Sequence, residues 1–379
     1  MERANLALAE YLQEEKIPLH LVAHEVDPEM ASRPGVSVHR VPLPRGSFLL
    51  GEPLLDRKGR AVARAVTTRW PGARVLVNGG NCAWDDLNWV HCVHQAWPCA
   101  DRGAPAWFRV KNRVMKEMAR RRERRIVPLA RMIIANSEQT RRQLVECLGV
   151  HPERIRTVYL GNDFTAEQMG IERRALARVW LKKPADRPLV AYLGALGHDR
   201  NKGFDTLLAA WRRLCADPTW DADLLAAGGG RGVPSWEREI AASHLSDRVC
   251  MLGFTDRVSD LLAAADLLVS PARYDAYGLN VHEAICHGIP ALVSGRAGVS
   301  ERFPPELKAM ILPDPTDVED LAGRLRAWRT EMERWRARFG PLAAELRIFT
   351  WRAAAAAIVS AAFESPEGIA AADVTVLPR

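Results

Sequence analysis

The chain has 379 residues, of which 48% are hydrophobic and 26% are charged, and its formal net charge is +7. These values exclude a largely disordered chain and leave room for two domains, each with its own core. Seven irregularly spaced cysteines exclude a small disulfide-stabilised scaffold and indicate reduced thiols. No signal peptide is visible at the N-terminus, and the most apolar late stretch, 353–363, is too short to cross a bilayer. We therefore expect a cytoplasmic protein.

Strand and helix patterns alternate along the chain, which predicts an α/β fold with parallel, doubly wound sheets. The first pattern is a helix at 2–15, with no strand before it. Because such a sheet normally starts with a central strand and a glycine turn, we infer that roughly 15 to 25 residues are missing at the start. The rest of the first half is expected to form strands at 19–23, 74–78, 89–94 and 132–136, a basic helix at 107–125, and a helix at 138–148.

The basic helix accounts for the whole charge imbalance of the chain. Residues 109–125 hold nine Lys or Arg side chains against Glu117 and Glu123. Apolar residues recur among them at roughly helical spacing: Trp107, Phe108, Val110, Val114, Met115 and Met118. Two interpretations are equally supported, a contact with an anionic membrane surface or a solvated helix whose apolar side joins the core. No nucleic-acid partner is expected, because the rest of the chain is near neutral and no nucleic-acid-binding motif accompanies the helix.

The second half repeats the alternation after a connection. Residues 161–188 contain no strand pattern, a helix pattern at 171–181 and a polar, Pro-containing end, which is typical of an interdomain link. Strands at 189–194, 223–228, 249–253 and 266–269 and a helix at 204–215 follow. Two α/β domains are expected to leave a cleft at the carboxyl ends of their strands, where ligands of such sheets bind.

One strand–loop–helix segment, 270–290, carries the strongest functional signal. Its loop contains Asp275 and Gly278, and its helix is predicted to begin at Leu279 and to contain Glu283. A helix that starts after a glycine loop directs free backbone N–H groups and a positive helix end at one point, which suits a pyrophosphate. Glu283 is placed to accept hydrogen bonds from a diol, so the segment suggests a nucleotide site. The alternative is an ordinary strand–helix crossover with two surface acids.

A second candidate segment follows the strand that opens the second domain. Arg200 and Lys202 lie there just before Gly203 and a helix, and two cations at a strand end suit a phosphate clamp. The alternative is a basic turn exposed to solvent.

His94 is predicted to close the strand at 89–94 and to face the cleft, whereas His91 is expected to point elsewhere. A buried histidine with satisfied hydrogen bonds is an equally good interpretation of His94. A zinc site is not expected, because the spacing of Cys82, Cys92 and Cys99 relative to these histidines matches no closed Cys/His pattern.

Asp275 and Glu283 are separated by seven residues and are followed by Cys-His-Gly-Ile-Pro. This arrangement resembles the E-x7-E motif of the retaining glycosyltransferases of family 4, although the first acid is Asp. The fold of that family is GT-B, in which two Rossmann-like, doubly wound domains face a cleft. Compared with that family, the chain is expected to lack the first strand and its Gly-rich loop. Further segments similar to the family in order are 133–140, 158–163, 225–230, 253–254 and 298–301.

The resemblance implies a role for each candidate residue. Glu283 would bind the ribose and Asp275 the sugar hydroxyls. The diphosphate would be held by Gly278, Leu279, Asn280, Arg200 and Lys202. The family's usual arginine after the first glycine is Ala195 here, and Arg200 would take its place. His94 would position the sugar, and no metal ion or other cofactor is expected.

The resemblance also implies a domain plan and a reaction. We expect an N-terminal acceptor-side domain at 1–170, a nucleotide-sugar-binding domain at 171–348, and a terminal helix with a tail at 349–379 that crosses back. The implied function is retaining transfer from a nucleotide-diphosphate sugar to a lipid-linked or glycan acceptor at the inner face of the cell membrane, with residues 107–125 touching anionic lipid. The alternative is a non-catalytic GT-B-fold binding protein or an inactive truncated form.

Overall fold

The computed structural model describes residues 2–101, 103–165 and 170–363. These residues form two compact units. Among the described residues, the first contains those up to 96, then 114–161 and 351–363, and the second contains those within 97–113 and 162–350. The chain therefore passes between the units at residues 96/97, within one helix, α4 (Ala106–Ile126), and at residues 161/162 and 350/351.

The first unit contains two parallel sheets. One pairs β1 (Leu19–Ala23) with β2 (Val36–Arg40), and the other has the order β3 (Leu76–Asn78), β4 (Leu87–Val90), β5 (Met132–Ala135), β6 (Ile155–Thr157). Every residue of β4 and β5 is buried, as expected for parallel strands covered on both faces. The other elements of this unit are α1 (Glu2–Glu14), α2 (Pro28–Ser32), η1 (Pro44–Gly46), α3 (Phe48–Arg69), η2 (Val127–Leu129), α5 (Glu138–Leu148), η3 (Pro152–Arg154) and α13 (Trp351–Phe363).

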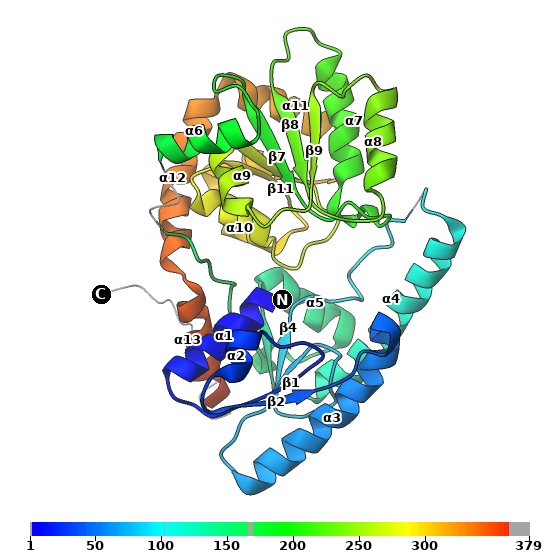
Figure 1. Cartoon of the computed structure of the whole chain (residues 1–379), viewed down its shortest axis with the longest axis vertical. Helices are drawn as coiled ribbons and strands as arrows, with labels where there is room; N and C mark the ends of the chain where they lie inside the picture. Colours follow the sequence, from blue (N-terminus) through cyan, green and yellow to red (C-terminus); the bar gives the residue numbers. More distant parts are fainter. Residues whose placement is uncertain (1, 102, 166–169, 364–379) are drawn as a thin grey trace. The chain divides into compact units, whose positions relative to one another are not determined.

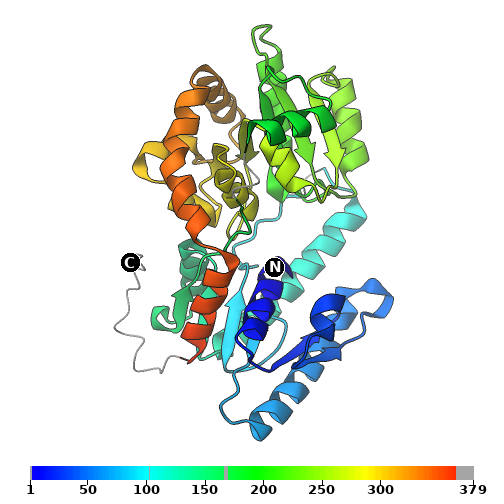
Figure 2. The same ribbon diagram turned by 60° about the vertical axis from the view of Figure 1, so that its left-hand side comes forward.

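Two helices from opposite ends of the described chain, α1 and α13, lie side by side in this unit (Figures 1 and 2). Arg352 at the start of α13 forms ion pairs with Glu14 and Glu15, and its guanidinium lies 5.1 Å from the centre of the Tyr11 ring. The sequence predicted both helices, and α1 is the first element of the structure, as the pattern indicated.

The second unit has one six-stranded parallel sheet with helices on both faces (Figure 1). Its strand order is β12 (Ile311–Leu312), β11 (Ala291–Ser294), β10 (Leu267–Ser270), β7 (Leu189–Leu193), β8 (Asp223–Ala227), β9 (Val249–Gly253). The helical elements are α6 (Ile171–Trp180), η5 (Arg200–Lys202), α7 (Phe204–Cys215), α8 (Val233–Ala242), α9 (Val258–Ala264), α10 (Leu279–Cys286), η6 (Gly298–Arg302), η7 (Pro305–Met310), α11 (Val318–Thr330) and α12 (Met332–Ile348).

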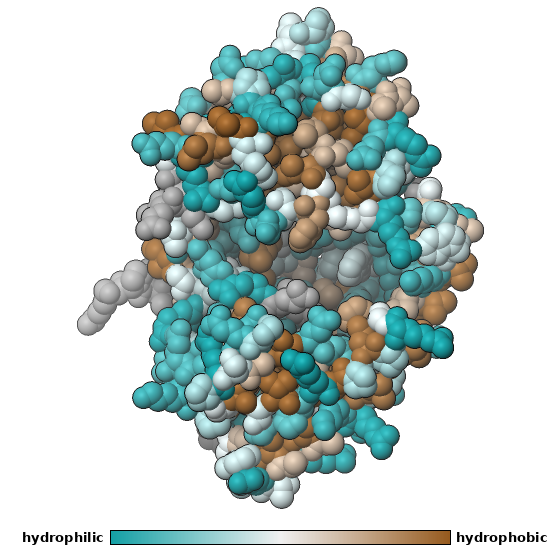
Figure 3. All heavy atoms as spheres, viewed as in Figure 1, coloured by the Kyte–Doolittle hydropathy of each residue, from teal (hydrophilic) through white to brown (hydrophobic). Residues whose placement is uncertain are grey.

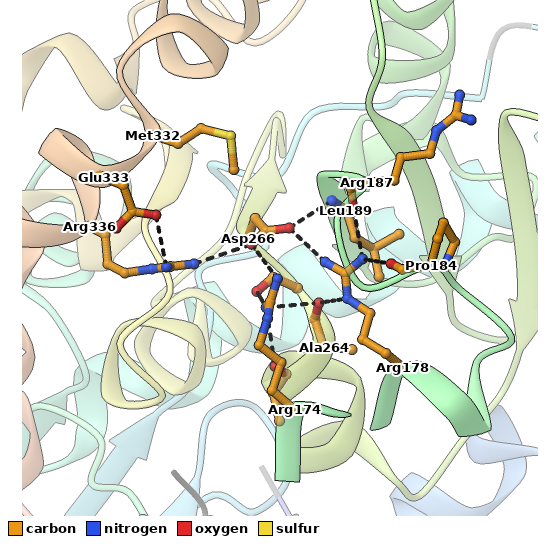
Figure 4. Close-up of polar contacts among 12 residues, drawn as sticks. Arg174, Arg178, Pro184, Arg187, Leu189, Ala264, Asp266, Met332, Glu333 and Arg336 are labelled. Atoms are coloured by element: carbon orange, nitrogen blue, oxygen red, sulfur yellow. Dashed lines mark hydrogen bonds and ion pairs between the residues drawn. The ribbon is translucent and has the colours of Figure 1, made fainter. Parts of the chain in front are cut away.

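A buried carboxylate fixes the helices at the amino ends of these strands. Asp266, just before β10, accepts from the Leu189 amide at 2.9 Å and lies 2.7 Å from the guanidinium groups of Arg174 and Arg178 (Figure 4). Arg336 of α12 approaches the same carboxylate at 3.2 Å. Because Asp266 and Arg178 are both almost fully buried, removing Asp266 would leave the Arg178 guanidinium in the core without its carboxylate partner. This network is structural and lies at the strand ends opposite the predicted ligand site.

All seven cysteines are free thiols. Within the described residues, no helix combines the length and apolar character needed to span a membrane.

Candidate functional site

The predicted strand–loop–helix unit is present in the second unit. β10 is fully buried, and α10 begins at Leu279, as the sequence indicated. Gly278 precedes the helix with φ of 100°, and a Cβ atom built on it would lie 2.9 Å from Val299 Cγ1. A glycine is therefore needed here both for its backbone angle and for lack of space.

The start of α10 presents unused donors. In the described part of the chain, the amides of Leu279 and Asn280 donate no hydrogen bond, because they belong to the first helical turn. The Asn280 side chain donates to the Leu193 carbonyl at 2.8 Å, which ties the helix start to the end of β7. Two free amides and a positive helix end at the carboxyl ends of the strands are the groups that could hold an anion.

The loop before α10 is held by a neighbouring segment of backbone. The Asp275 amide donates to the Arg296 carbonyl at 3.1 Å, the Gly298 amide donates to the Asp275 carbonyl at 3.1 Å, and the Val299 amide donates to the Tyr277 carbonyl at 2.6 Å. These bonds fix residues 275–277 beside η6. The position of the Asp275 side chain is therefore set by a rigid main chain.

Lys202 and Asp275 meet in this site. The Lys202 ammonium lies 2.6 Å from an Asp275 carboxylate oxygen, and the two side chains are 36% and 17% exposed. Both remain accessible to a ligand. The sequence predicted that both would contact the same ligand, and the structure brings them together as an ion pair.

A set of hydrogen bonds places Lys202 there. The Asn201 side chain donates to the Tyr274 carbonyl at 2.8 Å, and the Arg273 amide donates to the Asn201 carbonyl at 2.7 Å. Arg273 also forms two hydrogen bonds of 2.8 Å with the carboxylate of Asp205 in α7. This two-pronged pair is the strong form of a guanidinium–carboxylate contact, so residues 200–205 and 273–275 are joined firmly.

Arg200 is held differently. Its guanidinium lies 5.1 Å from the centre of the Trp236 ring and 3.9 Å from the Asp205 carboxylate, and its amide donates to the Ala100 carbonyl at 2.6 Å. Ala100 belongs to the short segment 97–101, which joins the second unit although it precedes α4. In that segment Trp97 also stacks on Tyr274, with 5.9 Å between ring centres. No local sequence pattern signals this long-range contact.

Glu283 lies on α10 and is half-buried. Burial, with a contribution from the charge of Asp163, raises the pKa of its carboxyl to about 7. No hydrogen bond to its side chain is present among the described residues. The Glu283 carboxyl oxygens could therefore accept hydrogen bonds from the hydroxyl groups of a ligand.

The adjacent His282 has a structural role that the sequence did not indicate. Its ring Nδ1 lies 2.6 Å from the Tyr277 hydroxyl, and the residue is fully buried. Burial lowers the pKa of His282 to about 3, so the ring stays neutral at physiological pH. The hydrogen bond between His282 and Tyr277 holds the loop that precedes α10 against that helix.

His94 lies in the first unit, and the structure corrects its predicted position. β4 ends at Val90, so His94 is in the following loop and does not close a strand. Buried Glu123 of α4 accepts from the amides of His94 and Gln95 at 2.9 and 3.1 Å and lies 3.2 Å from His94 Nδ1. Arg120 donates to the His94 carbonyl at 3.0 Å. These bonds, and no strand ladder, set the position of the ring.

The charge state of His94 follows from the same contacts. Burial on its own lowers the pKa of His94, but hydrogen bonds with Cys92 and Glu123 and the charges of both outweigh it and raise the pKa to about 10. The ring is therefore an imidazolium at neutral pH, with 34% of the side chain exposed. Glu123, which the sequence presented only as one acid in a basic run, contributes to this environment together with Cys92.

Seven of the eight predicted site residues lie in the second unit, and His94 lies in the first. The seven are Arg200, Lys202, Asp275, Gly278, Leu279, Asn280 and Glu283. Within the described ranges, no group of three or more His, Cys, Asp or Glu side chains is arranged to hold a metal ion.

Two family models match the chain in succession. A model described as Glycosyltransferase Family 4 matches residues 1–165, and one described as Glycosyl transferases group 1 matches residues 174–343. Among individual proteins, a D-inositol 3-phosphate glycosyltransferase of Thermobifida fusca is 31% identical over 233 residues, which are 58% of this chain and 52% of that protein. The alpha-D-kanosaminyltransferase of Streptomyces kanamyceticus is 26% identical over 205 residues, 53% of this chain and 52% of that protein. The chain spans about half the length of the curated relatives it matches.

Solved structures extend the likeness over nearly the whole chain. Sucrose-phosphate synthase from Thermosynechococcus elongatus superposes with a TM-score of 0.72 at 22% identity and covers 93% of this chain and 90% of its own. WaaG, a glycosyltransferase involved in lipopolysaccharide biosynthesis, superposes with a TM-score of 0.72 at 18% sequence identity, and the match covers 94% of this chain and 95% of WaaG. Anabaena HepE in complex with UDP-glucose superposes with a TM-score of 0.64 at 16% sequence identity, and the match covers 94% of this chain and 95% of HepE. The predicted GT-B fold is confirmed.

Proposed function

The chain belongs to glycosyltransferase family 4, and from this premise we propose that it transfers a sugar from a nucleotide-diphosphate donor to an acceptor with retention of anomeric configuration. One observation carries the proposal. Lys202, Asp275 and the free amides of α10 lie together at the carboxyl ends of the second unit's strands. A cation, an anion-binding helix start and a carboxylate are the groups that a sugar diphosphate requires.

Each part of the donor has a matching group. The amides of Leu279 and Asn280, with Lys202 and Arg200, would hold the diphosphate. Glu283 would accept hydrogen bonds from the ribose diol, and Asp275 would accept from sugar hydroxyls. HepE has been solved with UDP and glucose and with UDP-glucose, which supports a nucleotide-sugar donor for a chain of the same fold.

The chemistry follows from these charges. The bond between the anomeric carbon and the diphosphate oxygen breaks, and the acceptor oxygen bonds to the same carbon while its proton passes to the leaving phosphate. Negative charge grows on the diphosphate, where Lys202, Arg200 and the helix amides are already in place and need little reorganisation to stabilise it. No enzymic nucleophile is required on this front-face route, and the cations supply the charge that a divalent ion would otherwise bring. The imidazolium of His94 would donate a hydrogen bond that positions the sugar.

The acceptor is proposed to be lipid-linked or a glycan at the cytoplasmic face of the membrane, with α4 touching anionic lipid. On the apolar side of α4, Trp107, Val110 and Val114 are 54%, 65% and 51% exposed, whereas Phe108 and Met115 are partly buried. In the space-filling view, apolar side chains reach the surface along the right-hand margin over α4 (Figure 3). An exposed apolar stripe flanked by cations is typical of an interfacial helix.

Flotation with liposomes tests the membrane contact. Wild-type protein should float with anionic but not with zwitterionic vesicles, and Val110→Asp with Val114→Asp should abolish flotation. Equal recovery of both proteins with both vesicle types would refute the membrane contact and leave the transferase proposal standing.

A panel of nucleotide sugars tests the reaction itself. One member should raise the melting temperature of the chain, because a ligand that binds the folded state stabilises it. Release of the nucleoside diphosphate with transfer to an acceptor would then identify the activity. Stabilisation without any transfer or hydrolysis would instead favour a non-catalytic binding protein, and no stabilisation by any donor would overturn the proposal.

A further inference from the structure

A hollow of about 290 Å³ opens in the first unit between the end of β2 and the middle of α3. It is lined by Arg40, Val41, Pro42, Leu54, Arg57, Lys58 and Ala61. None of these residues belongs to the candidate donor site. Arg40 is the last residue of β2, whose end pairs with the end of β1, so the hollow lies at the carboxyl edge of a parallel sheet. Ligands of parallel sheets bind at that edge.

The charges around the hollow are unbalanced. Arg40, Arg57 and Lys58 are exposed, and among the described residues none of them forms a hydrogen bond or ion pair through its side chain. No carboxylate lines the hollow. Three cations around one small concavity repel one another, and an anion between them would remove that repulsion.

The acids of α3 do not compensate these cations, because they are already paired. Asp56 lies 3.0 Å from Arg60, and Glu52 lies 3.4 Å from Arg122. These are the only two acids in the helix sequence. Neutralisation of the hollow therefore has to come from outside the helix.

We propose that this hollow binds the phosphate group of an anionic ligand, seated among Arg40, Arg57 and Lys58. Two arginines offer forked donors that match phosphate oxygens, and the lysine adds a compact point charge. His39 of β2 lies near Lys58, whose charge acts on the ring together with that of His20. A bound anion would offset those charges, so the His39 signal provides a local readout of occupancy.

The walls of the hollow indicate what else the ligand carries. Val41, Pro42, Leu54 and Ala61 make part of the lining apolar. Leu50 and Leu54 lie one turn apart on α3 and are 50% and 37% exposed, and Arg57, Lys58 and Ala61 continue the same helix face. An apolar surface beside a phosphate-binding group fits a soluble phosphate ester with an apolar part or the head group of an anionic lipid. The shared chemistry is the phosphate group.

Two binding measurements on the full chain test this site and separate the two sources. Calorimetry with sn-glycerol 3-phosphate at constant ionic strength measures a soluble phosphate ester, and co-sedimentation with phosphatidylcholine vesicles, with and without phosphatidic acid, measures a head group. The test variant is Arg57→Gln with Lys58→Gln. The matched control is Arg64→Gln with Arg69→Gln, which removes the same charge from the same helix outside the hollow.

The test variant should weaken binding of at least one probe by roughly tenfold or more, since each lost charged contact is worth about 1.5–3 kcal/mol. The control should change binding by no more than about twofold, because Arg64 and Arg69 do not line the hollow and exposed charges at a distance contribute little. Arg40→Gln, on a different element, should reproduce the loss and guard against a local effect on α3. If the test variant loses binding only to vesicles that contain phosphatidic acid, the ligand is a lipid head group. If it loses binding to sn-glycerol 3-phosphate, the ligand is a soluble phosphate ester.

Absence of saturable binding to both probes, or an equal loss in test and control variants, would overturn the proposal. Thermal stabilisation by nucleotide sugars, measured on the same variants, should be unchanged. A failure of the phosphate site is thereby distinguishable from a failure of the transferase proposal, which would appear in wild-type protein.

Discussion

The Lys202 ammonium lies 2.6 Å from the Asp275 carboxylate, and the two residues are 73 positions apart in the sequence. The pair links η5 with the loop that precedes α10. Both partners are only partly buried, so a ligand can compete for either one. In our proposal the diphosphate takes over Lys202, which leaves Asp275 able to accept from the sugar. The ion pair would then keep both side chains in place until the donor arrives.

Lys202→Ala should lower donor affinity by roughly tenfold to a hundredfold, because one charge-assisted contact with the diphosphate is lost. Donor affinity can be measured by calorimetry with the nucleotide sugar that stabilises the chain. Lys308→Ala, which removes an exposed lysine of the same unit, should leave affinity unchanged. If the two variants bind the donor equally well, Lys202 serves only its ion pair with Asp275.

Gly278→Ala should destabilise the second unit by roughly 1–3 kcal/mol, since a side chain is strained at φ of 100° and its Cβ would meet Val299. The displaced helix start should also weaken donor binding. Gly323→Ala is the matched control, because Gly323 lies within α11 and a Cβ there meets nothing within 4 Å. The free energy of unfolding of that variant should rise by about 0.5–1 kcal/mol, because Ala has a higher helix propensity than Gly. Denaturant unfolding of both proteins decides whether the position of the glycine matters.

Strands β7 to β10 and helices α6, α7 and α10 of the second unit were predicted because each is signalled locally, whereas no prediction was made for α8, α9, α11 and α12. Buried parallel strands appear as short, continuous apolar runs, and the predicted range of α7, 204–215, is the observed one. Gly278 and Gly288 marked the two ends of α10 for the same reason. The candidate donor-site residues were chosen by the rule that ligands of such sheets bind at the carboxyl ends of the strands.

Other features depend on contacts that the sequence does not signal. The alternation at 89–94 imitates a strand, but β4 stops at Val90 because the backbone beyond it bonds to Glu123 instead. The sequence assigned no element to α3, where Gly51, Pro53 and Gly59 interrupt an otherwise helical pattern. The contact of Ala100 with Arg200 joins segments a hundred residues apart. Only the folded chain shows these relationships.

Glu283→Gln should make donor binding less sensitive to pH. Burial holds the pKa of Glu283 at about 7, above its usual value, so the folded chain keeps a proton that the unfolded chain releases. The resulting stability is fully present below about pH 4.5 and is lost as the pH rises through about 7. Donor affinity should change in the opposite sense, because the ionised carboxylate is the stronger acceptor for a ribose diol.

Wild-type affinity should therefore rise by up to roughly tenfold between pH 6 and pH 8, which is the difference between a neutral and a charge-assisted hydrogen bond. Calorimetry across this range should show a rise for wild-type protein and a flat profile for Glu283→Gln. Asp163→Asn should move the wild-type midpoint to lower pH, since Asp163 contributes to the raised pKa. Parallel profiles for wild-type protein and Glu283→Gln would exclude Glu283 from the ribose contact.

Glu123→Gln should lower the pKa of His94 by roughly 1–3 units, because the neighbouring negative charge that favours the imidazolium is removed. The same change should cost about 1–3 kcal/mol of stability, since one of the two amides that Glu123 binds would face a donor group. Stability contributed by protonated His94 is fully present below about pH 6.5 and is lost as the pH rises through about 10. The stability difference between Glu123→Gln and wild-type protein should therefore be smallest at the alkaline end of that pH range.

Histidine signals in heteronuclear NMR, followed between pH 5 and pH 10.5, measure the pKa of His94 directly. Glu117→Gln is the control, because Glu117 lies on the same helix, pairs with Arg121 and is 42% exposed. It should leave the His94 titration unchanged. A His94 pKa near its ordinary value in wild-type protein would mean that the ring is neutral when the enzyme works. A neutral ring keeps one N–H, which Nδ1 would donate to Glu123, so Nε2 would accept a hydrogen bond from the sugar where the proposal has it donate one.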